Sequence, residues 1–203
     1  EHSMKNMIIE TSFESKMILK ILKSFNDTLH KAEFGQLLEA YLELTSQASS
    51  EDVLKVHEYK TGYYTIYQPL EIGAISAGAT DHQINSLKEY ALAVGIAFQL
   101  KDDILGLFGD TKITGKPAID DLKEGKMTLL MSFALENASA KQKEVLLTYL
   151  GNKTISESEL LIVQKIVEET GSFKPSEDLI VELIDKAKKS LILSKILSCL
   201  QVK

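Results

Sequence analysis

The chain has 203 residues, of which 44% are hydrophobic, and this length and composition suit a folded domain rather than a disordered tail. Its formal net charge of -6 argues against a nucleic-acid partner, whose phosphates would be repelled. No uncharged run reaches the length of a transmembrane segment, and Cys199, the single cysteine, cannot form an internal disulfide. We therefore expect a protein of a reducing compartment such as the cytoplasm.

Apolar residues at helical spacing dominate the first half of the chain. They form two stripes, Met17, Ile18, Ile21, Leu22 and Phe25 in the first and Phe34, Leu37, Leu38, Tyr41 and Leu42 in the second. Ser50 is the expected N-cap of a helix that runs past Lys60 to Pro69, where it must kink or restart because proline lacks an amide donor. Asp81 is the expected cap of another helix, which ends near Leu107.

The second half of the chain begins with a polar segment, which is followed by residue patterns that predict helices. Residues 109–125 are polar and aperiodic, and we expect one long ordered loop there, of the kind that usually carries function. Capping-box patterns at 139–142 and 156–159 predict two short helices, and the last proline precedes an amphipathic helix over about 176–200. With no alternating strand pattern, the sequence predicts an all-α helical bundle, a single domain over residues 1–203.

The most informative stretch is an apolar run that ends in two acids. Residues 91–98 are apolar on every side, which predicts a buried helix, and the carboxylates of Asp102 and Asp103 follow at once. Gln99 lies three and four residues before them and shares their face. Adjacent buried carboxylates repel each other unless a cation lies between them, and Mg²⁺ prefers such hard oxygen ligands. The alternative is a solvated pair at an exposed helix end, which is the usual state of an isolated Asp-Asp pair.

Lysines follow the acids closely. The four that lie between the acid pair and residue 126 are Lys112, Lys116, Lys123 and Lys126. Lysines are point charges that suit diphosphate oxygens, and acids suit magnesium. Together on a helix and the segment that follows it, they predict a site for a magnesium diphosphate.

These residues form motifs that resemble a known family. FQLKDDILGLFGD at 98–110, TGKP at 114–117 and DLKEGKMT at 121–128 resemble, in order and spacing, the second aspartate-rich region of the trans-type polyprenyl diphosphate synthases. Upstream, Lys60-Thr61 with PLEIG at 69–73 resembles the Lys-Thr region of that family. FGQ at 34–36, with Glu39 close behind, resembles its Gly-Gln helix. The resemblance covers essentially residues 21–203.

The resemblance implies a fold and a reaction. The fold would be the helical bundle of isoprenoid synthases, and the reaction would join an allylic diphosphate to isopentenyl diphosphate and release diphosphate. Asp102 and Asp103 would bind Mg²⁺, and Asp110 would support them through water. An apolar bundle interior would shield the allylic cation from water.

The remaining site residues follow from the same resemblance. Lys60 and Lys116 would hold the allylic diphosphate, with help from Lys126. Thr61 and Gln99 would face the reacting carbon and stabilise the cation. Taken alone, Lys60 and Thr61 are ordinary helix residues. His30, His57 and His82 show no common metal-ligand spacing and receive no role.

The chain departs from the family pattern in two places. Gly106 stands where the motif Asp-Asp-x-x-Asp has its last aspartate, and no first aspartate-rich motif precedes Gly35. We therefore expect a bundle that is incomplete on its N-terminal side, as a truncated chain or a short homologue. Three alternatives follow: part of an active prenyltransferase, a non-catalytic binding or partner subunit, or a helical scaffold that keeps the motifs without their function. Apolar surface left open by an incomplete bundle favours association, so we expect a homodimer.

Overall fold

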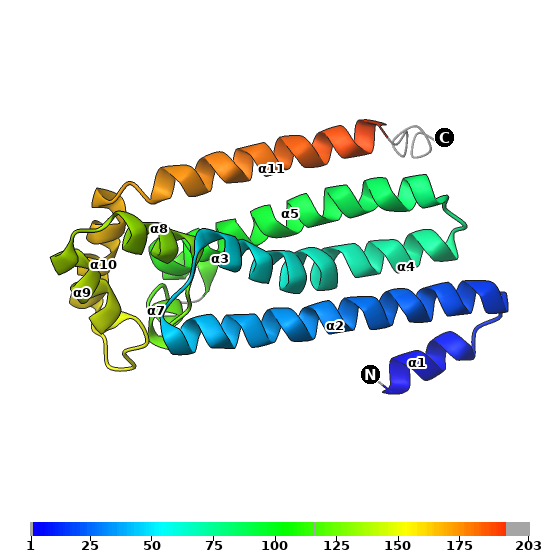
Figure 1. The fold of residues 1–203 in the computed structure, drawn as a ribbon, viewed down its shortest axis with the longest axis horizontal. Helices are drawn as coiled ribbons and strands as arrows, with labels where there is room; N and C mark the ends of the chain where they lie inside the picture. Colours follow the sequence, from blue (N-terminus) through cyan, green and yellow to red (C-terminus); the bar gives the residue numbers. More distant parts are fainter. Residues whose placement is uncertain (1, 116, 194–203) are drawn as a thin grey trace.

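The computed structural model describes residues 2–115 and 117–193, and helices make up its architecture (Figure 1). In chain order they are α1 (His2–Ile9), α2 (Ser15–Thr45), α3 (Ser50–His57), η1 (Glu58–Tyr67), α4 (Gln68–Ser76), α5 (Asp81–Phe108), α6 (Thr111–Thr114), α7 (Asp120–Glu124), α8 (Leu129–Asn137), α9 (Ala140–Tyr149), α10 (Glu157–Glu169) and α11 (Phe173–Leu193). No strand occurs among these described residues, which confirms the predicted all-α class.

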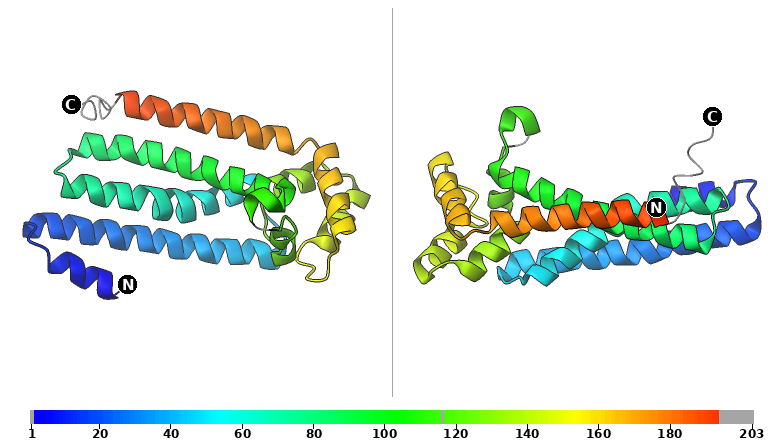
Figure 2. Two further views of the ribbon diagram at one scale, coloured as in Figure 1. Left: turned by 180° about the vertical axis from the view of Figure 1, so that it is seen from behind. Right: turned by 90° about the horizontal axis from the view of Figure 1, so that it is seen from above.

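The long helices lie side by side in one elongated layer. In Figure 1 the order across the layer is α11, α5, the continuous rod of α3, η1 and α4, then α2, with α1 folded back beside α2. The contacts agree, because α5 packs against both α11 and η1, and η1 packs against α2. The short helices α8, α9 and α10 gather at one end (Figure 2), where they meet the C-terminal half of α5. The site described below lies where the layer meets this end.

The core follows from this arrangement. The larger buried cluster joins the second half of α5 to the short helices, and Leu100, Leu130, Leu146, Val163 and Val167 are among its most buried members. A second cluster of Tyr63, Tyr67 and Ala91 holds η1 to the first half of α5.

Several helix boundaries differ from the sequence-based expectation. The two apolar stripes of the first half belong to one continuous helix, α2, and not to two separate helices. Ser49 rather than Ser50 caps α3, because its hydroxyl accepts from the amide of Asp52 in a capping box. Thr80 rather than Asp81 caps α5 in the same way. The capping boxes predicted at 139–142 and 156–159 are confirmed.

The predicted break at Pro69 takes an unexpected form. Residues Glu58–Tyr67 form a π-helix, and α4 starts with Pro69 in its first turn. α4 continues the rod of η1 without a sharp kink (Figure 1), although a proline lacks an amide donor. π-Helical turns are rare and are often found at functional sites. Lys60 and Thr61 lie on this one.

The expectation of one long loop at 109–125 was wrong. Two short helices, α6 and α7, interrupt the segment, and each ends at a glycine with positive φ, Gly115 at 71° and Gly125 at 80°. Helices of one turn are too short to show an apolar period. The last helix also begins earlier than predicted, at Phe173, with Pro175 inside its first turn. Its predicted end near residue 200 lies outside the described residues.

The apolar run before the acids is only partly buried. Ala91, Ala93 and Ala97 are buried, but Phe98 is 60% exposed, so the prediction of burial on every side was wrong. Gly95 lies against Gly62 of η1, whereas Val94 and Phe98 line an open groove beside α11. Among the described residues, no helix is both long enough and apolar enough to span a bilayer.

Glycines set the close approach of three helices. A Cβ atom at Gly95 on α5 would lie 2.6 Å from Gly62 Cα on η1, and one at Gly35 on α2 would lie 2.9 Å from Tyr59 Cβ. Both distances are too short for real side chains, so a larger residue at either position would push η1 away from its neighbour. The glycine of the Gly-Gln motif therefore has a packing role.

We expect Gly95→Ala to lower the free energy of unfolding by about 1–3 kcal/mol, because its methyl group would meet the Gly62 backbone. Gly73→Ala is the matched control, because nothing lies within 4 Å of a Cβ at this helical position. That variant should be neutral or more stable by up to about 1 kcal/mol. Urea unfolding followed by circular dichroism measures both. Equal stabilities of the two variants would contradict the close-approach argument.

Candidate functional site

A buried carboxylate lies at the centre of the site. Asp103 on α5 is 1% exposed, and two basic groups from other elements reach it. His57 Nε2, at the end of α3, lies 3.1 Å from Asp103 Oδ2, and Lys126 Nζ donates to Asp103 Oδ1 at 2.8 Å. A buried charge is stable only with such partners. Asp103 therefore links α3, α5 and the segment after α7.

Lys126 is shared by three carboxylates. Besides Asp103, its ammonium lies 3.6 Å from Asp121 Oδ2 and 4.0 Å from Asp102 Oδ2. The left-handed residue Gly125 ends α7 just before Lys126 and turns the chain back toward α5. The loop lysine is thus part of a charge cluster with the acids of α5.

Burial and charge act in opposite directions on the two central groups. Burial alone would raise the pKa of the Asp103 carboxyl, but hydrogen bonds and positive charge from His57 and Lys126 lower it below the usual value. Burial likewise opposes the charge of Lys126, yet the neighbouring carboxylates, above all Asp103, raise its pKa above that of a free lysine. Both groups are therefore charged at neutral pH.

Hydrogen bonds connect the acids to η1. Thr61 Oγ1 donates to Gln99 Oε1 at 2.9 Å, and Gln99 Nε2 donates to Asp103 Oδ1 at 3.2 Å and to Asp102 Oδ2 at 3.3 Å. The Gly62–Gly95 contact described above brings η1 close enough to α5 for this chain of bonds. Thr61 is buried, whereas the Asp102 side chain is 55% exposed. Asp102 is therefore the accessible member of the acid pair.

Lys60 joins the site to α2. Its ammonium contacts the Glu39 carboxylate of α2, and Gln36 Nε2 donates to the same carboxylate at 3.2 Å. Gly35 permits this approach of α2 to η1, because a Cβ atom there would lie 3.0 Å from Lys60 Cγ. The Lys-Thr and Gly-Gln motifs therefore meet in space.

A polar cavity of about 320 Å³ lies among these groups. Its lining consists of Glu39, Glu43, Val56, His57, Lys60, Thr61, Gln99, Asp121, Glu124 and Lys126. Burial and the nearby charge of Glu39 raise the pKa of Glu43 above the usual value. With four carboxylates against two lysines, the wall carries more negative than positive charge. A polyanion would meet repulsion here unless a cation accompanied it.

The structure brings most of the predicted site residues together. Lys60, Thr61, Gln99, Asp102, Asp103 and Lys126 all contact one another or line the same cavity. Asp110 instead caps α6, where it accepts from the amide of Lys112 at 2.9 Å. Lys116 lies outside the described residues.

Sequence reasoning missed His57 and Asp121. It sought metal-ligand spacing among the histidines, whereas His57 contacts a carboxylate 46 positions away. One local signal was present: on a continuing helix, His57 lies three and four residues before Lys60 and Thr61 and shares their face. Asp121 stood in the motif at 121–128 but received no role, because its position beside Gly106 of α5 depends on how α7 packs.

The donor chemistry fits magnesium bound in part by the protein. Asp102 offers an accessible carboxylate, and the buried Asp103 Oδ2 has His57 Nε2 at 3.1 Å. No group of three or more His, Cys, Asp or Glu side chains within the described chain is placed to enclose a metal ion. Mg²⁺ is commonly held by one or two carboxylates together with water and substrate phosphates, so these residues suit it without a complete protein cage.

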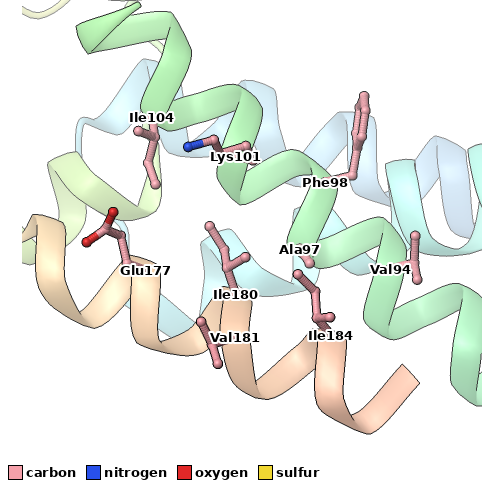
Figure 3. A pocket seen from close by; sticks show the side chains of 9 residues that line it. All are labelled: Val94, Ala97, Phe98, Lys101, Ile104, Glu177, Ile180, Val181 and Ile184. Atoms are coloured by element: carbon pink, nitrogen blue, oxygen red, sulfur yellow. The ribbon is translucent and has the colours of Figure 1, made fainter. Parts of the chain in front are cut away.

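A larger cavity lies on another face of α5 (Figure 3). It encloses about 490 Å³ between α5 and α11, and its lining is Val94, Ala97, Phe98, Lys101 and Ile104 from α5 and Glu177, Ile180, Val181 and Ile184 from α11. None of the predicted site residues belongs to this set. The two charged side chains lie at one end of the groove in Figure 3, and the rest of its lining is apolar.

Comparison with known proteins agrees with this fold and site. A family model described as polyprenyl synthetase matches residues 2–169. The chain is 33% identical to a geranylgeranyl diphosphate synthase of Sulfolobus acidocaldarius over 178 residues, which are 88% of this chain and 52% of that protein. It is 30% identical to a geranylfarnesyl diphosphate synthase of Aeropyrum pernix, with 90% of this chain and 56% of that protein covered.

Solved structures give the same result. A geranylgeranyl pyrophosphate synthase of Corynebacterium glutamicum, in complex with isoprenyl diphosphate and magnesium, superposes with a TM-score of 0.86 at 34% identity. The match covers 92% of this chain and 53% of that one. The chain therefore belongs to the polyprenyl synthetase family. It spans about half the length of the relatives that it matches.

The lowered pKa of Asp103 predicts an acid-sensitive fold. Because this carboxyl binds its proton less readily when folded than when unfolded, its ionised form contributes stability that is present above the unfolded pKa and lost as the pH falls through the folded pKa. We expect the free energy of unfolding to fall below about pH 4. Urea titrations at pH 7 to 3 measure this, and Asp103→Asn should lose that part of the pH dependence.

The neighbouring variant Asp102→Asn is the control, since its side chain is 55% exposed and should keep most of the slope. Equal slopes in the wild type and Asp103→Asn would show that the buried carboxylate does not govern acid stability.

Proposed function

We propose that this chain carries one side of the active site of a Mg²⁺-dependent prenyltransferase. The reaction condenses an allylic diphosphate with isopentenyl diphosphate, forms the next longer prenyl diphosphate and releases diphosphate. The observation that supports this most is the connected path from Thr61 through Gln99 to Asp102, Asp103 and Lys126 beside one polar cavity. The C. glutamicum relative bound to isoprenyl diphosphate and magnesium supports the same substrate class.

The lysines hold the leaving diphosphate in this proposal. Lys60 and Lys126 both line the cavity, and each is paired with a carboxylate, Lys60 with Glu39 and Lys126 with Asp103. Lys116 belongs to the same set through its motif. Magnesium, when bound through Asp102, Asp103 and, by way of water, Asp110, would neutralise charge on the departing diphosphate. Fixed cations reduce the cost of bond breaking because the negative charge develops next to them.

Thr61 and Gln99 face the carbon end of the substrate. Gln99 Oε1 accepts from Thr61, and its amide group donates to both acids, so its orientation is fixed from two sides. Amide and hydroxyl oxygens near the allylic carbon stabilise the positive charge that develops on it, and they do not themselves bond to that carbon. The same oxygens are suitably placed to guide proton loss that ends the condensation.

A second candidate is a non-catalytic homologue that binds diphosphate or supports a partner subunit. The observation that favours it is length, because the chain covers 52% of the Sulfolobus relative. Both candidates require the same metal and diphosphate contacts. The two candidates differ only in whether the chain catalyses the condensation.

A homodimer fits the surface of α2. Four large side chains follow one another on this helix at a spacing of three or four residues and are all exposed, namely Phe34, Leu37, Tyr41 and Leu44. Leu37 and Leu44 are 71% and 87% exposed, which is unusual for an apolar stripe on a monomer surface. A second copy of the chain would cover this stripe by packing its own α2 against it.

The condensation is tested directly with Mg²⁺, isopentenyl diphosphate and farnesyl diphosphate, with products identified by mass spectrometry. We expect a longer prenyl diphosphate, and we expect Asp102→Asn to reduce its rate of formation at least about tenfold through weaker metal binding. Asp120→Asn is the matched control, because Asp120 is not among the carboxylates around Lys126. Isothermal titration with Mg²⁺ and inorganic diphosphate supplies a second readout.

The outcomes separate the two candidates. Product that depends on Asp102 supports the prenyltransferase. Diphosphate binding that requires Mg²⁺ and Asp102, without product, supports the binding or partner subunit. A chain that neither turns over nor binds would contradict both.

The dimer proposal predicts a change in mass. We expect about twice the mass of one chain by light scattering at micromolar concentration, and a single-chain mass for the double variant Leu37→Glu/Leu44→Glu, because buried charges would disrupt the interface. Leu161→Glu, on α10 and 64% exposed, is the control and should leave the mass unchanged. A wild-type chain that is monomeric, or a dimer insensitive to the double variant, would contradict the proposal.

A further inference from the structure

The turn of residues 150–156, which joins α9 to α10, makes a backbone contact with α7. The amide of Gly151 in this α9–α10 turn donates to the carbonyl of Leu122 on α7 at 2.9 Å. The same carbonyl accepts from the amide of Gly125 at 3.2 Å, within the turn that ends α7. One buried carbonyl group therefore joins two turns that are distant in the sequence.

The two glycines pack directly against each other. Both have a left-handed backbone, with φ of 80° at Gly125 and 79° at Gly151. A Cβ atom at Gly125 would lie 3.3 Å from Gly151 Cα and 3.5 Å from Gly151 N. A contact this close requires the neighbour to give way, and here the neighbour is backbone held by a hydrogen bond. The two turns therefore fit together because position 125 has no side chain.

Lys126 follows this contact directly. Its amide donates to the carbonyl of Asp121 at 3.0 Å, so the backbone of the lysine belongs to the turn that ends α7. Its ammonium group lines the polar cavity and lies 2.8 Å from Asp103 Oδ1. A displacement of the turn would therefore move the ammonium group within the cavity.

Asn152 stabilises the α9–α10 turn from within. Its Oδ1 accepts from the amide of Thr154 at 2.9 Å and from the hydroxyl of Thr154 at 2.8 Å. An asparagine that binds the backbone two residues ahead fixes a turn by itself. Ile155, which is 4% exposed, anchors the same turn in the core. Gly151 is thus presented to α7 by a turn that its own contacts hold in place.

We propose that the α9–α10 turn is a positioning element for Lys126, and that the contact between Gly125 and Gly151 sets where the lysine meets the diphosphate. The inference rests on the proposed function, in which Lys126 holds the leaving diphosphate. Both glycines act through the lysine, so they are positioning residues and not catalytic ones.

A purely structural role makes a different prediction. If the contact only anchors α7 in the core, Gly125→Ala lowers the stability and leaves the diphosphate affinity of the folded protein unchanged. Gly171→Ala is the matched control, because Gly171 also has a positive φ, 68°, and nothing lies within 4 Å of a Cβ there. Both variants carry the backbone strain of a left-handed alanine, so a difference between them reports the contact with Gly151.

The test is the affinity for inorganic diphosphate in the presence of Mg²⁺, measured by isothermal titration on the full chain. We expect Gly125→Ala to weaken binding by about tenfold, because a small displacement of a binding group has a large effect. Gly171→Ala should leave the affinity unchanged. Asn152→Ala, which loosens the turn and keeps both glycines, should also weaken binding. Asn137→Ala, which removes a side-chain hydrogen bond at the end of α8, should not.

A double-mutant cycle shows whether the glycine acts through the lysine. In a Lys126→Ala background, Gly125→Ala should cause no further loss of affinity, whereas it should still lower the stability in urea. An equal loss of affinity in both backgrounds would show that the contact acts by another route, and would overturn the inference.

The outcomes distinguish this inference from the function on which it rests. If the wild type binds diphosphate and Gly125→Ala binds it as tightly, the inference is overturned and the proposed function stands. If Gly125→Ala does not fold, as judged by circular dichroism, an unchanged affinity of Asn152→Ala overturns the inference instead. If the wild type shows no Mg²⁺-dependent binding of diphosphate, the proposed function falls, and this inference with it.

Discussion

The contact between Lys126 and the buried carboxylate of Asp103 is the constraint on which the site depends. A carboxylate that is 1% exposed cannot remain ionised without partners, and its two basic partners come from outside α5. The segment after α5 must therefore fold back through α6 and α7 until Lys126 reaches Asp103. This one ion pair closes the cavity on the side of α7 and fixes where Asp102, the exposed acid, is presented.

Three glycines, which have no side chain, determine how closely the helices around this ion pair approach one another. Gly35 lets η1 approach α2, Gly95 lets it approach α5, and Gly106 lets Asp121 approach the acid pair. Packing density leaves little freedom at such contacts, because even one methyl group must displace backbone or carboxylate atoms. The Gly-Gln and Lys-Thr motifs are far apart in the sequence. In the structure they meet where two helices pack closely, with the polar side chains of the site beside the contact.

Local patterns predicted the parts that depend on local structure. The capping boxes and the shared face of Gln99, Asp102 and Asp103 follow from spacings of three or four residues. The approach of His57 to Asp103 could not be predicted, since it depends on how the rod packs on α5. The position of Asp121 beside Gly106 depends in the same way on how α7 packs.

The charges of the cavity bear on the order in which ligands enter. Its wall has four carboxylates and two lysines, and both lysines are already paired with acids. A free diphosphate would have to break these pairs while it faces uncompensated negative charge. A divalent cation is attracted by the negative wall instead. Once bound, its positive charge offsets the repulsion between the wall and phosphate oxygens. If the chain has the proposed function, this arrangement would favour metal and diphosphate entering together, and the lysines would move from protein carboxylates to the diphosphate as it binds.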